Sequence, residues 1–139
     1  MGIKVPLTIC HQYTSLPCPT ARLKLVAKDI FSKEKIPTTR SVTLILCSDY
    51  KIRKLNADYR KLDRTTDVLS FCFEDSDFLG EIYISLQRAK VQAKKYNLSN
   101  DDEIIRLFVH GMFHLLGYDH LVDKERDIME AKERKYFKV

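Results

Sequence analysis

The chain has 139 residues, and its 45% hydrophobic composition supplies enough apolar material for one domain with a real core. Its 24 Lys and Arg against 19 Asp and Glu leave a net charge of +5, which favours polyanionic partners without resembling a bare nucleic-acid-binding tail. No apolar run approaches the ~18 residues of a membrane-spanning helix, and the N-terminus has no signal-peptide core. We therefore expect a cytoplasmic protein with no membrane association.

The first third of the chain predicts a strand, a helix and a second strand. Apolar residues alternate over residues 3–9, and Pro6 within this stretch indicates an edge strand. Apolar residues then recur at helical spacing after Thr20, which can cap a helix that ends before Pro37. The nearly continuous apolar run over residues 41–47 is typical of a strand that is covered on both faces.

The middle of the chain predicts a short helix and two strands. Ser48 can cap the helix, which should end around Tyr59 and lead into a polar loop. Residues 67–73 and 79–85 are rich in strand-forming residues and are joined by an acidic loop. Together with the first two strands, they make about four.

Three further helices are expected in the second half. The first follows a cap at Ser85 and carries a basic face. The second is capped by Ser99 or Asn100 and ends at Gly117. The third is a charged helix over about 123–137. The sequence thus predicts a single α+β domain over residues 1–139, with a mixed sheet of about four strands packed with about five helices.

Three of the four histidines lie together in the segment HGMFHLLGYDH. His110 and His114, four residues apart on a helix, point from the same face and can present two imidazole nitrogens to one ion. Gly117 can end the helix in the left-handed conformation, so that His120 swings back toward them. Three ligands leave one position open, as a catalytic zinc requires, whereas Asp119 or a cysteine in that position would make the site structural.

The spacing H-x-x-x-H-x-x-G-x-x-H is also that of the metzincin metalloproteases, which makes a zinc-dependent protease or amidohydrolase an alternative. Residue 111 is glycine, where those proteases place the glutamate that serves as general base. We expect this glycine to open room beside the ion for a bulky anionic substrate.

The same segment closely resembles the H-G-x-L-H-L-x-G-Y-D-H signature of the YbeY family, bacterial metal-dependent endoribonucleases that act in ribosomal RNA maturation, with Phe113 in place of leucine. The stretch LNADYRKLDRTTDVLSF is similar to the family's N-x-x-Y-R followed by T-D-V-L-S-F, and LGEIYIS to its G-D-I-x-I-S strand. Cys72 and Glu81 depart from the usual proline and aspartate.

The resemblance implies that His110, His114 and His120 bind one Zn²⁺ and that Arg60 is the functional arginine, and we predict Arg60 and His114 as catalytic residues. Arg60 can hold a phosphate bidentately, although a surface salt bridge is its simpler interpretation. Asp67 can orient a histidine or Arg60, or it can serve as a turn residue.

The predicted function is a single-strand-acting endoribonuclease that hydrolyses phosphodiesters of ribosomal RNA precursors, with the ribosomal subunit or its assembly proteins as partners. A ribosome-assembly factor with a mainly structural metal is the alternative. Basic residues are expected to form the rim that binds the RNA backbone. They are Arg53, Lys54, Arg64, Lys90, Lys94 and Lys95.

Overall fold

The computed structural model describes residues 5–73, 75–118 and 123–137, which form four strands and five helices. In chain order the elements are β1 (Leu7–His11), α1 (Thr20–Lys33), β2 (Ser41–Cys47), α2 (Asp49–Arg60), β3 (Val68–Cys72), β4 (Phe78–Ser85), α3 (Leu86–Lys95), α4 (Asn100–Leu115) and α5 (Asp123–Glu133). None of these helices is both long and apolar enough to cross a membrane. The predicted α+β class is confirmed.

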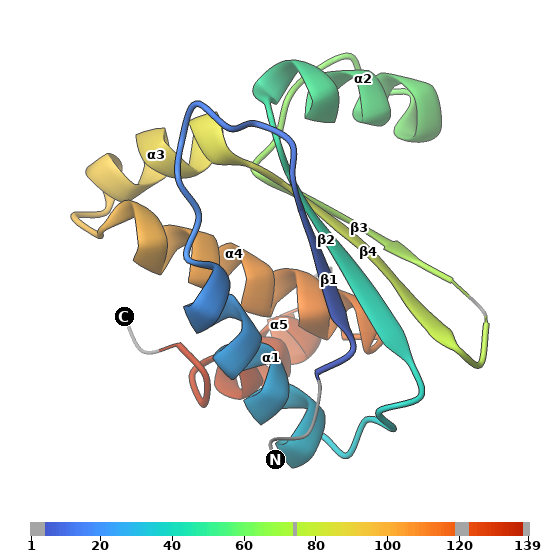
Figure 1. Cartoon of the computed structure of the whole chain (residues 1–139). Coiled ribbons are helices and arrows are strands. Elements are labelled where there is room, and N and C mark those ends of the chain that lie inside the picture. Colours follow the sequence, from blue (N-terminus) through green and yellow to red (C-terminus); the bar gives the residue numbers. More distant parts are fainter. Residues whose placement is uncertain (1–4, 74, 119–122, 138–139) are drawn as a thin grey trace.

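The strands form one mixed sheet in the order β1-β2-β4-β3. β1 and β4 both pair in parallel with β2, and β3 pairs antiparallel with β4 (Figure 1). β2 is therefore central, and the side chains of Val42, Leu44 and Leu46 are fully buried, as its continuous apolar run predicts. β1 and β3 are the two edges, which confirms the edge position that Pro6 indicates.

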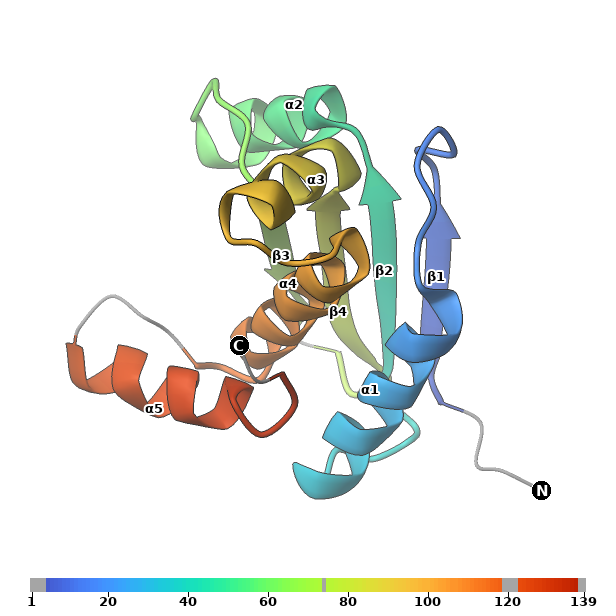
Figure 2. The ribbon, with the colours of Figure 1, turned by 90° about the vertical axis from the view of Figure 1, so that its left-hand side faces the viewer.

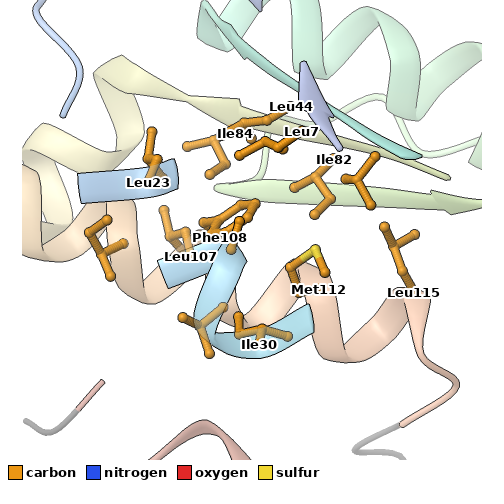
Figure 3. Packing of buried hydrophobic residues seen from close by; sticks show 14 of the residues in the cluster. Leu7, Leu23, Ile30, Leu44, Ile82, Ile84, Leu107, Phe108, Met112 and Leu115 are labelled. Carbon is orange, nitrogen blue, oxygen red and sulfur yellow. The ribbon is translucent and has the colours of Figure 1, made fainter. Parts of the chain in front are cut away.

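The main core lies between the sheet and helices α1 and α4. Figure 3 shows Phe108 and Met112 of α4 pointing toward Leu44, Ile82 and Ile84 of the sheet. Full burial of a side chain of this size stabilises the fold by about 1.5–3 kcal/mol. α4 is consequently held firmly against the strands, and this fixes where its polar residues lie.

The other face of the sheet is covered at one end by α2 (Figures 1 and 2). A smaller cluster forms there from Ile45, Cys47, Ile52 and Leu69. Burial raises the pKa of the Cys47 thiol to about 12. This thiol therefore stays protonated at neutral pH and packs as a small apolar group.

Three of the four predicted helix caps are confirmed. The hydroxyls of Ser48, Ser85 and Ser99 accept hydrogen bonds from backbone N–H groups at the starts of α2, α3 and α4. The cap at Thr20 is wrong: Pro19 is the N-cap residue of α1, and it makes no side-chain cap hydrogen bond. Thr20 is instead the first helical residue, and its hydroxyl lies 3.3 Å from the thiol of Cys18.

The first strand is shifted relative to its prediction. It begins at Leu7, immediately after Pro6, and continues to His11 rather than ending at Ile9. Pro6 has no N–H to donate, so it marks the start of the pairing, although its carbonyl accepts a hydrogen bond from Val42.

Candidate active site

A cavity of about 650 Å³ opens beside the free edge of β3. Arg60 lines it from the end of α2, residues 66–72 line it from β3 and the preceding loop, and α4 contributes His110, His114 and Leu115. The structure therefore brings the predicted arginine and two of the predicted histidines together, although 50 residues separate Arg60 from His110 in the chain.

His110 and His114 face each other across one turn of α4. Their Nε2 atoms lie 3.1 Å apart, and the ring centroids are 4.6 Å apart with an angle of 80° between the rings. The prediction that the two imidazoles project from the same helix face is confirmed.

Glu133, the last residue of α5, orients the ring of His110. Its Oε1 lies 2.8 Å from Nδ1 of His110, and both side chains are mostly buried, with 20% and 26% exposed. A carboxylate can only accept, so Nδ1 carries the hydrogen, and Nε2 of the neutral ring becomes the acceptor that faces His114. Sequence reasoning missed Glu133 because it lies in a charged helix with no motif, and its relation to His110 arises only from the packing of α5.

The third predicted ligand, His120, lies outside the described residues, as does Asp119. Within the described part of the chain, no third histidine, cysteine or acidic residue joins the pair to form a metal-binding group. Cys72 lines the cavity, but its thiol donates to the carbonyl of Leu115 at 3.7 Å. The three-histidine site thus stays a prediction of which the structure describes two members.

The donor set that is described fits a zinc-type ion. Two nitrogens that each lie ~2.05 Å from one zinc at the tetrahedral angle are about 3.3 Å apart. The observed separation of 3.1 Å between the two Nε2 atoms is close to this value.

Gly111 faces the sheet and not the cavity. A Cβ added there would meet Cγ2 of Ile82 at 2.8 Å and Oγ of Ser70 at 3.2 Å, and the Ser70 hydroxyl donates to the Gly111 carbonyl. The expectation that this glycine opens room beside an ion is wrong, because its missing side chain instead lets α4 approach β3 and β4 closely.

Gly117 ends α4 as the sequence predicts. Its φ is +96°, its N–H donates to the carbonyl of His114, and the N–H of Tyr118 donates to the carbonyl of Phe113. These two bonds are the Schellman motif of helix C-termini. The chain therefore turns sharply just beyond His114.

Arg60 reaches the cavity because α2 ends there. Lys61 has a left-handed backbone with φ +58°, and the N–H groups of Lys61 and Leu62 donate to the carbonyl of Asn56. The buried side chain of Asn56 in turn donates to the carbonyl of Arg64 at 2.9 Å. These bonds tie the polar loop to the helix and fix the direction in which Arg60 leaves it.

Asp67 lines the same cavity, and its hydrogen bonds go elsewhere. One carboxylate oxygen accepts from the backbone N–H of Val68 at 2.8 Å, and the other accepts from the amide of Gln92 at 3.2 Å. The turn interpretation of Asp67 is therefore the one that these contacts support.

Fold and pocket together define an α+β protein whose cavity pairs two facing imidazoles with an arginine. The chain belongs to the YbeY family: the family model described as "Endoribonuclease YbeY" matches residues 9–139. The chain is 49% identical to the endoribonuclease YbeY of Finegoldia magna over 102 residues, covering 70% of this chain and 67% of the relative. It is 40% identical to that of Endomicrobium trichonymphae over 116 residues, with 84% and 82% covered.

A solved structure has the same fold. The solution structure of TM1509 from Thermotoga maritima superposes with a TM-score of 0.66 at 31% identity, covering 94% of this chain and 85% of that one. These findings confirm the predicted resemblance to the YbeY family and the predicted enzyme class, an endoribonuclease. They also support the predicted role in ribosomal RNA maturation.

Proposed function

We propose that the cavity beside β3 is the catalytic site of this endoribonuclease, and that it hydrolyses phosphodiesters in single-stranded segments of ribosomal RNA precursors with one zinc ion. The observation that carries the proposal is the pair of facing Nε2 atoms, 3.1 Å apart, in the same cavity as Arg60. The alternative function, a ribosome-assembly factor whose metal only organises the fold, gives this open cavity no role.

His110, His114 and His120 would hold the ion. When bound, such an ion polarises a phosphoryl oxygen and lowers the pKa of water to about 7. Glu133 supports this role because its hydrogen bond to Nδ1 leaves Nε2 of His110 as the electron-pair donor on the cavity side.

Arg60 would bind the scissile phosphate. Its guanidinium is permanently charged and can donate two parallel hydrogen bonds to phosphate oxygens, an interaction that strengthens as charge develops on them. No metalloprotease-type base is available at position 111, because glycine has no carboxylate, and Gly111 is buried against Ile82. The protease alternative therefore has no support at the position where its general base would stand.

Ribosomal subunits or their assembly proteins are the proposed partners, and the cytoplasm the proposed compartment. Of the predicted basic rim, Arg64 lines a hollow next to the cavity, while Arg53 is paired with Asp63 at 2.9 Å. The lysines of α3 are not among the residues that line the cavity. We expect the RNA affinity to fall as salt is added, since backbone contacts release counterions.

The test combines metal analysis with two substrates. Purified wild type and the variants His110→Ala, His114→Ala and His120→Ala are measured for zinc content and incubated with structured RNA or casein, with and without chelator. Joint loss of zinc and RNA cleavage in each variant, with casein intact throughout, is the expected result. A folded His114→Ala variant that still cleaves RNA at the wild-type rate contradicts the proposal.

A further inference from the structure

Three aromatic rings form a continuous ladder next to the cavity. Tyr59 of α2 contacts Phe71 of β3 edge to face, with ring centroids 5.7 Å apart, and Phe71 contacts Tyr83 of β4 in the same way at 5.8 Å. These rings lie on the sheet face that α2 covers only at one end (Figure 1). The ladder joins the core of this face to the solvent at Tyr59.

Tyr59 is the outermost ring, and its side chain is largely in water. The residue is 70% exposed, whereas Phe71 and Tyr83 are partly buried. Its edge-to-face contact with Phe71 restricts the orientation of the ring and still leaves aromatic surface uncovered. A ring that is held in this way is already arranged to receive a flat partner.

The surroundings of Tyr59 match a polyanion. Arg60 is the next residue and lines the main cavity, to which Phe71 also contributes. A second hollow of about 290 Å³ adjoins it, sharing Arg60 and Thr66 as lining residues and adding Arg64. The ladder therefore leads from Phe71 in the wall of the cavity, which Arg60 and Thr66 also line, to the exposed ring of Tyr59. Proteins bind single-stranded nucleic acid without reading its sequence by combining aromatic surface with cationic groups.

We infer that Tyr59 is a stacking platform for one nucleobase of a single-stranded RNA whose adjacent phosphate is held at Arg60. The inference rests on the proposed RNA substrate and goes further, because it assigns a base-binding subsite. Stacking takes the base out of the strand's own stack and so favours a bent, unpaired segment at the cavity. A duplex cannot offer a free base face, so the subsite discriminates against paired RNA.

The test uses a second exposed tyrosine of α2 as its control. Tyr50 lies on the same helix and is 76% exposed, but it makes no ring contact with any other described residue. Binding of a fluorescent single-stranded RNA is measured with chelator present, so that the strand stays intact. Because loss of one base–aromatic stack costs ~1–3 kcal/mol, Tyr59→Leu should weaken binding by about 5- to 150-fold. Tyr59→Phe and Tyr50→Leu should bind like wild type.

A second measurement changes the RNA and compares wild type with Tyr59→Leu. The bases of the strand are replaced one at a time by abasic nucleotides. At one position this replacement should weaken binding to wild type as much as the Tyr59→Leu substitution does. The same replacement should not weaken binding to Tyr59→Leu any further. Equal binding by wild type and Tyr59→Leu, or an equal loss in Tyr50→Leu, overturns the stacking inference while RNA cleavage by wild type still stands. Failure of wild type to bind any single strand overturns the RNA substrate as well.

Discussion

Nδ1 of His110 donates to Oε1 of Glu133 at 2.8 Å, a bond that joins the histidine helix α4 to the last residue of α5. A ligand histidine whose second nitrogen is fixed by a carboxylate has both its tautomer and its ring direction set before the ion arrives. The C-terminal helix is therefore part of the proposed metal site, although it lines no wall of the cavity.

Removing this carboxylate should weaken zinc binding. In Glu133→Ala we expect the zinc dissociation constant, measured by chelator competition, to rise by about 10- to 100-fold, because the His110 ring loses its partner. Glu133→Gln keeps an acceptor oxygen and should lie between wild type and Glu133→Ala. Glu130→Ala is the matched control, since Glu130 lies one turn earlier on α5 and pairs only loosely with Arg134, at 3.7 Å. Equal zinc affinity in Glu133→Ala and Glu130→Ala would contradict the role of Glu133.

Replacing Arg60 should slow catalysis and leave the metal in place. We expect kcat for RNA cleavage by Arg60→Ala to fall by ~10²- to 10³-fold, the range found when one preorganised donor to a developing oxyanion is lost. Arg60→Lys should recover only part of it, because an ammonium group cannot bind a phosphate with two parallel bonds. Zinc content should match wild type in both variants.

The control for Arg60 lies two turns earlier on α2. Arg53 forms an exposed ion pair with Asp63 at 2.9 Å, and solvent screens pairs of this kind so strongly that they contribute little to stability. Arg53→Ala removes one positive charge from the same helix and should leave kcat near the wild-type value. An equal loss of kcat in both alanine variants would mean that Arg60 acts only through the net charge of the helix.

Sequence reasoning succeeded where the relevant forces are local. The caps at Ser48, Ser85 and Ser99 and the Schellman turn at Gly117 depend on bonds within a few residues of each helix end, so their residue types reveal them. The pairing of His110 with His114 likewise follows from helix geometry alone.

Sequence reasoning failed where tertiary packing determines which residues come into contact. α4 is buried around most of its circumference, so its sequence does not reveal which side meets the sheet, and the prediction for Gly111 is wrong for this reason. Glu133 could not be chosen among the many acidic residues of α5, because its contact depends on how that helix docks through Met129 and through Tyr136, which follows the helix. The edge position of β3, which opens the cavity, also depends on strand order.

The packing of Gly111 can be tested by stability. Gly111→Ala should lower the free energy of unfolding by about 1–3 kcal/mol, because the new methyl group would lie 2.8 Å from Cγ2 of the fully buried Ile82. Chemical denaturation measures the change. If the contact with Ile82 is the cause, the same substitution should cost much less in an Ile82→Ala background. A cost that is the same in both backgrounds would place the strain elsewhere.

The docking of α5 should weaken in acid through Glu34. Its carboxylate accepts from the hydroxyl of Tyr136 at 2.6 Å and from the ammonium group of Lys132 at 3.1 Å. Burial raises the pKa of Glu34, but these two hydrogen bonds outweigh it and leave the pKa below the ordinary value of 4.5. A carboxyl group whose pKa is lower in the folded state stabilises the fold above its unfolded pKa, and this contribution is lost as the pH falls through the folded pKa.

Thermal unfolding of wild type and Glu34→Gln across pH 3–7 measures this contribution. The wild type should have the higher melting temperature near neutral pH, and the difference should shrink below about pH 4.5, where protonation makes the two side chains alike. Asp123→Asn is the control, because Asp123 pairs with Arg126 in an exposed contact on α5. Since Tyr136 and Lys132 flank Glu133, the Glu34→Gln variant should also bind zinc more weakly than wild type at neutral pH. Unchanged zinc affinity in that variant would show that His110 and Glu133 keep their contact without this anchor.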